Sequence, residues 1–177
     1  MLRPRLLVAL AAAAPTVLLA WYPITSTAAA TTATCAGQTA TIAVTAHSPH
    51  VVYGTGHRDV FAIHDAGHVV RARGGNDLVC GSGGQDVVYG GPGADHLYGN
   101  GGPDRMYGGY GDDTIQGRYG NDHLYGGPNV DHMYGGPGDD YVDGGGGADY
   151  CYGGAGHNIM DTDMHDHMGD YHDGMHH

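Results

Sequence analysis

Residues 90–107 read Gly90-Gly-Pro-Gly-Ala-Asp-His-Leu-Tyr98 and then Gly99-Asn-Gly-Gly-Pro-Asp-Arg-Met-Tyr107, two nine-residue units with the same plan. Outward from these units, an Asp recurs at every ninth residue nine times in succession. With Gly90 as position 1, these Asp residues stand at position 6, and Gly fills positions 1 and 4 in nine of the ten units between residues 72 and 161. Position 8 is apolar in all ten units. The chain is therefore a tandem array of the repeat G-x-x-G-x-D-x-U-x, where U is apolar.

This repeat predicts a tight turn followed by a short strand. Glycine at positions 1 and 4 can take positive φ, which lets carbonyl oxygens of the turn point at a shared ion. The carboxylate at position 6 adds a hard oxygen donor, the kind that Ca²⁺ prefers. Positions 7–9 form a strand, and its middle side chain points inward because side chains alternate along a strand. The predicted fold class is all-β.

Units such as residues 90–98 resemble the RTX (hemolysin-type) calcium-binding nonapeptide G-G-x-G-x-D-x-U-x. The resemblance covers residues 54–161; the unit 54–62 keeps Asp59, but the units on either side of it carry His50 and His68 where Asp is expected. It implies a right-handed parallel β-roll in which two nonapeptides make one coil. It also implies one Ca²⁺ between loops that stack on the same edge of the roll.

We predict that the position-6 carboxylates bind calcium and that the ions are structural. If stacked partners lie 18 residues apart, one edge pairs alternate Asp residues from Asp77 to Asp149 and the other pairs those from Asp86 to Asp140, which makes about seven full sites. Asn158 leaves Asp140 with at most a half-site. One apolar side chain per unit is a thin core, and stacked carboxylates repel one another, so folding and metal binding should be one event. The predicted ligands are Asp77, Asp86, Asp95, Asp104, Asp113, Asp122, Asp131, Asp140 and Asp149.

The composition excludes several other functions. The formal net charge is −12, so cations are expected partners and nucleic acid is not. The chain contains no Glu and no Lys, which excludes an HExxH zinc protease and a P-loop. Its three serines, Ser26, Ser48 and Ser82, do not form a GxSxG motif. With no acid, base or nucleophile constellation outside the loops, we expect a protein that is not an enzyme.

The order of segments predicts an exported protein. Residues 1–30 are typical of a signal peptide, with Arg3 and Arg5 before an apolar stretch and the run Ala28-Ala-Ala30 as a cleavage site. The apolar stretch is too short for a membrane span, so we expect a secreted, extracellular chain. Residues 31–53 are assigned to an N-terminal cap and a degenerate first repeat. Residues 54–161 form the β-roll, and residues 162–177 are a His-, Asp- and Met-rich tail expected to be disordered.

The cysteines predict one disulfide. Cys35 precedes Ile42 and Val44, whose alternation suggests a strand that covers the open edge of the first coil, and Cys80 lies at an outward position of an early coil. A Cys35–Cys80 disulfide would pin this cap in an oxidising compartment. Cys151 stands at an inward position 8 and should pack as a small apolar side chain.

Two features leave other functions open. Tyrosine recurs at position 9, and these rings either stack along a sheet face or form an aromatic stripe that binds a glycan or a cell surface. The tail either solubilises the chain or binds Cu or Zn through His and Met, as a metal scavenger would. The position-9 tyrosines are Tyr89, Tyr98, Tyr107, Tyr125, Tyr134 and Tyr152.

Overall fold

The computed structural model describes residues 33–161 and 167–168, so the predicted signal peptide lies outside it. The regular structure of the described residues consists of strands and no helix, and hence no membrane-crossing helix is found among them. In chain order the strands are β1 (Thr34–Cys35), β2 (Gln38–Thr39), β3 (Ile42–Val44), β4 (Val51–Tyr53), β5 (Val60–Ile63), β6 (Val69–Arg71), β7 (Leu78–Cys80), β8 (Val87–Pro92), β9 (His96–Gly101), β10 (Arg105–Tyr110), β11 (Thr114–Tyr119), β12 (His123–Pro128), β13 (His132–Pro137), β14 (Tyr141–Gly146), β15 (Tyr150–Ala155), β16 (Ile159–Asp161) and β17 (His167–Met168).

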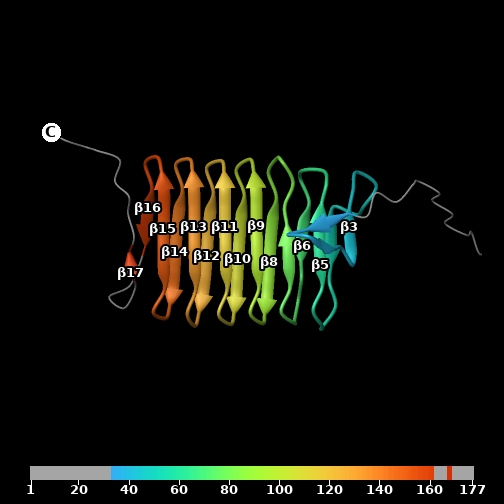
Figure 1. The fold of residues 1–177 in the computed structure, drawn as a ribbon, viewed down its shortest axis with the longest axis horizontal. Coiled ribbons are helices and arrows are strands. Elements are labelled where there is room, and N and C mark those ends of the chain that lie inside the picture. Colours follow the sequence, from blue (N-terminus) through green and yellow to red (C-terminus); the bar gives the residue numbers. More distant parts are fainter. Residues whose placement is uncertain (1–32, 162–166, 169–177) are drawn as a thin grey trace, which may run out of the picture. The chain divides into compact units, whose positions relative to one another are not determined.

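Successive strands alternate between two parallel sheets. The odd-numbered strands from β3 to β17 form an eight-stranded sheet, and the even-numbered strands from β4 to β16 form a seven-stranded sheet (Figure 1). Between β4 and β16, neighbours within a sheet are offset by 18 residues; Met106, for example, pairs with Val88 on one side and Leu124 on the other. Two nonapeptides therefore make one turn of a parallel β-solenoid of about seven turns, which confirms the predicted all-β roll.

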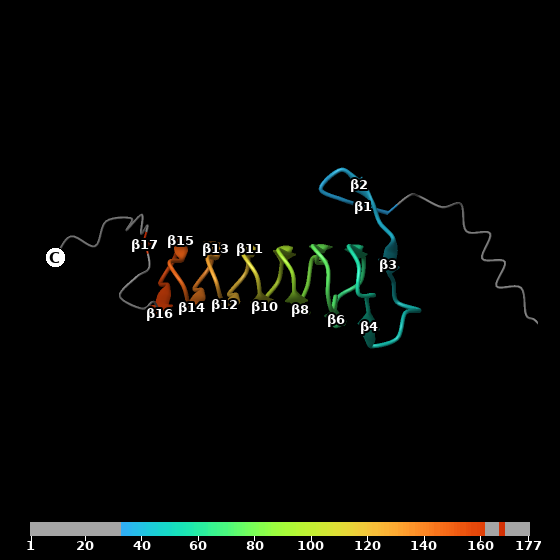
Figure 2. The ribbon, with the colours of Figure 1, turned by 90° about the horizontal axis from the view of Figure 1, so that it is seen from below.

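The core lies between the two sheets and consists of the position-8 side chains. Figure 2 shows the chain crossing from one sheet to the other between successive strands. Each strand of the regular repeats places one buried apolar side chain between the sheets. From Val79 to Cys151, these side chains are between 0 and 1% exposed. They are Val79, Val88, Leu97, Met106, Ile115, Leu124, Met133, Val142 and Cys151.

The strands of the regular repeats are longer than the sequence predicts. From β8 to β15 each strand has six residues, running from position 7 of one unit to position 3 of the next. Pairing continues through the first glycines of the following unit, as between Gly109 and Gly91. A glycine has no side chain, so it can hold an extended or positive-φ backbone close to the coil beneath it.

The N-terminal residues cover the first coils in two places: β3 covers the open edge of the eight-stranded sheet, and the hairpin β1–β2 lies against one face of that sheet. β3 pairs in parallel with β5, with Ile42 opposite Phe61, so it is the first strand of the eight-stranded sheet. The antiparallel hairpin β1–β2 is tied to β7 by the Cys35–Cys80 disulfide, whose Cα atoms are 5.5 Å apart. The predicted disulfide and the predicted edge strand are thus both present.

A second apolar cluster lies under this hairpin, outside the main core. Cys35, Val60 and Leu78 are buried in it, and Tyr98 packs against them. β4 already belongs to the seven-stranded sheet, so the two sheets begin upstream of residue 54, within the segment that the sequence assigns to a cap and a degenerate first repeat.

At the other end of the roll, the backbone of His167 and Met168 forms β17 and pairs with β15. This is a contact with the roll that the expectation of a disordered tail did not include. Residues 162–166 and 169–177 of the predicted tail lie outside the described residues.

Candidate metal-binding loops

The position-6 aspartates form two columns, one along each edge of the roll. In each column the backbone N–H of one Asp donates to Oδ1 of the Asp one coil later, at N···O distances of 2.7–2.8 Å. One column runs from Asp77 to Asp149 and the other from Asp86 to Asp140, in the pairing expected from an 18-residue coil. The side chains are at most 2% exposed. The structure therefore brings all nine predicted residues into two buried ladders.

One carboxylate oxygen in most of these residues has no hydrogen-bond donor among the described residues. A buried carboxylate oxygen without a donor is unfavourable, because it has lost its water and gained nothing in return. The arrangement repeats from coil to coil, so it is a property of the loop and not an accident of one site. The oxygens are Oδ2 of Asp77, Asp95, Asp104, Asp113, Asp122, Asp131 and Asp140, and Oδ1 of Asp86.

A backbone carbonyl lies close to the Oδ2 atom in the six loops of Asp95, Asp104, Asp113, Asp122, Asp131 and Asp140. A Cβ added at Gly90 would collide with Oδ2 of Asp95 and would lie 2.7 Å from the carbonyl oxygen of Gly108 in the next coil. Gly99, Gly108, Gly117, Gly126 and Gly135 have equivalent neighbours. In these six loops glycine at position 1 leaves open the space between the carboxylate and the next carbonyl, which a side chain would occupy; the loop of Asp77 has Ala72 at this position.

The turns stack with their own carbonyls directed toward the next coil. At position 2 the backbone takes positive φ, +115° at Gly109, and a Cβ there would strike the carbonyl oxygen of Gly91 one coil earlier. At position 4, Asn129 takes the same kind of conformation with φ of 95°, which Asn tolerates better than most residues. The loops therefore present carbonyl and carboxylate oxygens together and little else.

Burial makes these carboxylates harder to ionise. Desolvation raises the pKa of Asp95 and Asp140 to about 6, of Asp113 and Asp131 to about 7, and of Asp104 to about 8. The N–H bond from the preceding Asp partly opposes this effect, and neighbouring carboxylates add to it, as Asp122 and Asp86 do for Asp104. The pKa values of Asp77 and Asp122 are also raised, mainly by burial. A bound cation would favour the ionised form that the fold otherwise resists.

The donor set fits calcium better than a transition metal. Among the described residues, no three His, Cys or Asp side chains converge on one point. A cation in these loops would have one or two carboxylates and otherwise backbone carbonyls, all of them hard oxygen donors. Calcium takes about six to eight such ligands and tolerates irregular geometry. The residues present therefore fit calcium.

One column begins earlier than predicted. The backbone N–H of Asp59 donates to Oδ1 of Asp77, and Asp59 is itself 6% exposed, so it precedes Asp77 on that edge. The sequence signal was present, because Asp59 stands at position 6 of its unit, but the irregular units around it kept it off the set of predicted ligands.

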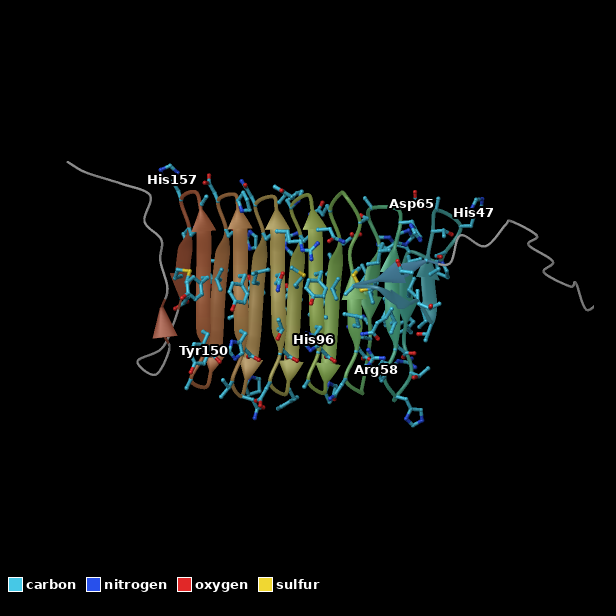
Figure 3. All side chains as sticks on the ribbon, viewed as in Figure 1. His47, Arg58, Asp65, His96, Tyr150 and His157 are labelled. Carbon is cyan, nitrogen blue, oxygen red and sulfur yellow. A yellow bond between two sulfur atoms is a disulfide. The ribbon has the colours of Figure 1, made fainter. Side chains whose placement is uncertain are left out.

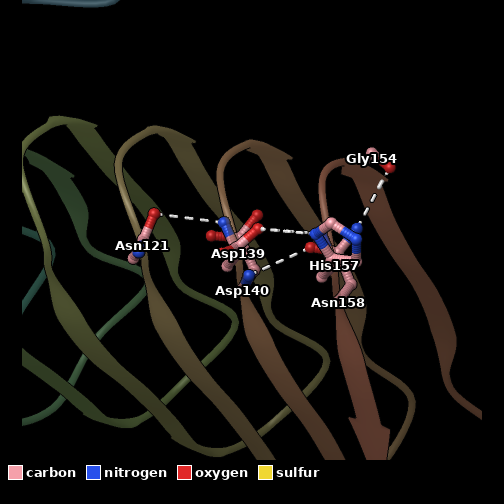
Figure 4. Close-up of polar contacts among 6 residues, drawn as sticks. All are labelled: Asn121, Asp139, Asp140, Gly154, His157 and Asn158. Carbon is pink, nitrogen blue, oxygen red and sulfur yellow. Dashed lines mark hydrogen bonds and ion pairs between the residues drawn. The ribbon is translucent and has the colours of Figure 1, made fainter.

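The other column ends as predicted in an amide. Asn158 Oδ1 accepts the N–H of Asp140 at 3.0 Å, and its Nδ2 donates to the carbonyl of Gly154 (Figure 4). Beside it runs an outer, exposed ladder, in which Asn121 Oδ1 accepts from the N–H of Asp139 and Asp139 Oδ1 accepts from the N–H of His157. The last loop thus satisfies its polar groups without an ionised residue at position 6.

The sheet faces carry the aromatic side chains. Tyr89, Tyr107 and Tyr125 stack with ring centroids 4.7 and 4.8 Å apart, at the step expected for neighbouring strands, and the Arg71 guanidinium lies 4.4 Å from the Tyr89 centroid. The faces of these rings therefore contact one another. On the other sheet, His96 and Tyr150 project from the strand surface (Figure 3). This supports ring stacking, while a glycan or cell-surface partner for the tyrosines stays an untested prediction.

Comparison with known proteins agrees with this geometry. The family model of the RTX calcium-binding nonapeptide repeat matches the chain in four overlapping copies, at residues 71–106, 98–132, 107–141 and 125–160. No curated protein matches the chain. The four copies together span residues 71–160, about half of the chain and all of its regular repeats. The chain therefore belongs to the family of RTX calcium-binding nonapeptide-repeat proteins.

Proposed function

We propose that this chain is an extracellular protein in which calcium, held between stacked loops by the position-6 aspartates and turn carbonyls, stabilises the β-roll. Membership of the family implies calcium binding in a structural role. The observation that supports the particular ligands is the repeated buried Oδ2 atom, close to the position-1 carbonyl of the next coil. Calcium supplies there the positive charge and the oxygen-binding capacity that the loop lacks.

The charge distribution explains why the ion is needed for folding. Each column brings carboxylates to successive coils, where their mutual repulsion opposes stacking and burial opposes ionisation. The position-8 core adds one enclosed side chain per nonapeptide, which is little apolar surface for so many ordered residues. We infer that metal binding and folding of the repeats are thermodynamically one process.

Two features support an extracellular setting. Residues 1–30 have the composition of an export signal, and the Cys35–Cys80 disulfide is typical of an oxidising compartment. Fractionation of cells that express the full chain tests this: we expect a chain that starts near residue 31 in the medium. Retention of the uncleaved chain inside the cell would contradict it.

A calcium titration tests the binding function. The purified chain is freed of metal with a chelator and titrated with CaCl₂ by calorimetry and by circular dichroism, with MgCl₂ as the matched control. We expect cooperative gain of β structure at roughly 10⁻⁴–10⁻³ M calcium, the range of extracellular modules, and a much weaker response to magnesium. Equal β content with chelator and with calcium would show that the ion is not part of the fold.

A further inference from the structure

Two loops near the start of the roll differ from all the regular repeats in the hydrogen bonds that the Asp carboxylate accepts. In the loop 54–59, Oδ2 of Asp59 accepts hydrogen bonds from the backbone N–H of Thr55 at 2.7 Å and from its hydroxyl at 2.9 Å. In the loop 81–86, Oδ2 of Asp86 accepts from the N–H and the hydroxyl of Ser82, both at 2.8 Å. The oxygen that has no donor in the regular loops therefore has two donors here.

The backbone of these two loops differs as well. Position 2 takes positive φ in the other units from residue 72 onward, even where it is Arg73 (φ 79°) or Arg118 (φ 73°). Thr55 and Ser82, which also stand at position 2, do not take positive φ. Their hydroxyls bond within the turn instead: the Ser82 hydroxyl lies 3.2 Å from the N–H of Gly84, and the Thr55 hydroxyl 3.1 Å from the N–H of His57. Serine and threonine close turns locally in this way.

In the loop 81–86 the carboxylate has also moved away from the space beside position 1, whereas in the loop 54–59 Oδ2 of Asp59 stays 2.9 Å from a Cβ added at Gly54. In the regular loops a Cβ at position 1 would collide with Oδ2 of the Asp in the same unit, as at Gly99 with Asp104. At Gly81 the three nearest atoms are instead backbone atoms of Tyr98 and Gly99. Asp86 has therefore turned toward Ser82. The unit one coil earlier has His68 at position 6 in place of an Asp, and Oδ1 of Asp86 has no donor among the described residues.

Both loops stand at the head of a column. Asp59 is the first Asp on one edge and Asp86 is the first on the other. The same coils contain the largest core side chain, Phe61, the second apolar cluster and the Cys35–Cys80 disulfide. The two loops that contain Thr55 and Ser82 thus lie in the part of the roll that a disulfide and a larger apolar core stabilise without metal.

We propose that Thr55 and Ser82 close the first loop of each column without calcium, so that residues 33–89 form a metal-independent nucleus on which the repeats from residue 90 fold as calcium binds. The inference rests on the proposed function, because it divides the loops into those that take calcium and those that do not. The Asp86/Asp104 pair then drops out of the seven predicted sites, since the Oδ2 that would face the ion is occupied. Six full sites remain: Asp77/Asp95, Asp95/Asp113, Asp113/Asp131, Asp131/Asp149, Asp104/Asp122 and Asp122/Asp140.

Hydrogen exchange with mass spectrometry, performed on the full chain in chelator and in calcium, tests the nucleus. In chelator we expect slow exchange in peptides from residues 42–89 and fast exchange in peptides from residues 90–161, with both slow in calcium. Uniformly fast exchange in chelator that calcium then slows along the whole roll would overturn the inference. A failure of calcium to slow exchange in residues 90–161 would instead refute the proposed function, so the two failures are distinguishable.

Ion counting by native mass spectrometry tests the role of the hydroxyls. Ser82→Gly restores the regular loop, so we expect one more calcium per chain than in the wild type and faster exchange of residues 78–92 in chelator. Thr55→Gly should likewise add one ion at Asp59. Ser48→Gly, at a serine outside both columns, is the matched control and should change neither measurement. Unchanged ion counts in both Ser82→Gly and Thr55→Gly would overturn the assignment; if one variant does not fold in calcium, the other decides.

Discussion

The coils before residue 90 and the repeats after it share one solenoid but are stabilised differently. The early strands β4 to β7 have three or four residues, and they enclose Phe61 and carry a disulfide and a second apolar cluster. The later strands β8 to β15 have six residues each, a single enclosed side chain per unit, and turns that consist largely of glycine. The difference indicates that regular glycine turns permit long, close stacking but leave the carboxylates in need of a cation.

The comparison also shows that the position-6 aspartates occur in two different hydrogen-bonding environments. Asp59 and Asp86 are held by hydroxyl and N–H donors within their own loops, whereas Asp113 has an Oδ2 that receives no hydrogen bond from the described residues. The same residue type is therefore a turn-forming group in the early coils and a candidate ligand in the later ones. The residue at position 2, which is Thr55 or Ser82 in the early loops, determines which of these two roles the Asp has.

The largest effect that we expect is the change with pH in the stability of the calcium-free repeats, because several carboxylates contribute to it. Folded-state pKa values of about 6 to 8 at Asp95, Asp113 and Asp104 lie above the value of about 3.9 for an unfolded chain, so the folded form binds more protons in this interval. In chelator, stability of residues 90–161 should rise as the pH falls from 8 toward 4 and be lowest above pH 8.

Circular dichroism and hydrogen exchange in chelator across this pH range measure the effect. Protons and calcium compete for the same carboxylates, so the calcium midpoint should shift to higher concentration as the pH falls. Calcium-free repeats that lose β structure on acidification from pH 8 to pH 5 would contradict the burial of these groups.

Removal of the disulfide should weaken the early coils next. Cys35 and Cys80 are 45 residues apart, and closing such a loop in the unfolded chain is worth about 4 kcal/mol. We expect the Cys35→Ser/Cys80→Ser variant to lose the slow exchange of residues 42–89 in chelator and to regain much of it in calcium. Adding a reductant to this variant should have no further effect, whereas it should reproduce the loss in the wild type.

A substitution in the middle of an Asp column should lower stability less than removal of the disulfide does, but more than a substitution on the surface. Asp113→Ala removes the acceptor of the Asp95 N–H, which costs about 1–3 kcal/mol for a buried donor left unsatisfied, and it interrupts two stacked sites. Thermal unfolding in calcium measures this loss. The neighbouring Asp112→Asn, at an exposed residue of the same loop, keeps the Oδ1 acceptor of the Val130 N–H, so it is the control and should change stability by about 0.5 kcal/mol or less. Equal losses in the two variants would argue against shared ligation.

The smallest effect should come from the tyrosine stack. Tyr107 lies between Tyr89 and Tyr125, and each aromatic pair is worth about 0.5–1.5 kcal/mol beyond the area it buries. Tyr107→Ala should therefore lower stability in calcium by a similar amount without changing the number of bound ions. Tyr110→Ala, at a ring that is 69% exposed, should be nearly neutral. A change in ion count for Tyr107→Ala would show that the stack and the loops are coupled.

The repeat period determined most of the fold, for a physical reason. The resemblance to RTX repeats implied that two units make one coil, and side chains at one position of every second unit must then stack. The Asp columns, the position-8 core and the 4.8 Å tyrosine step could therefore be predicted from the resemblance and the spacing together. The Cys35–Cys80 pairing followed from the outward register of Cys80. These inferences depend on the repeat period, on the coil that the resemblance implies and, for the disulfide, on the place of Cys35 in the segment before the repeats.

The rest depends on contacts that no period encodes. β3 pairs with β5 at an offset of 19 residues, with Ile42 opposite Phe61, so this pair does not follow the 18-residue period of the regular repeats. The bond from Ser82 to Asp86 is a local turn choice, and the only sequence signal for it is a hydroxyl residue at position 2. The place of Asp59 at the head of one column was not predicted, because the units on either side of it are irregular.

The most direct test of the central claim is a crystal structure of the calcium-loaded chain with anomalous scattering to locate the ions. The account predicts anomalous peaks in contact with Oδ2 of Asp113 and of Asp122, repeated along both edges, and none in contact with Oδ2 of Asp86. Peaks absent from the Asp columns, or a peak at Asp86 Oδ2 as strong as those at the regular loops, would contradict it.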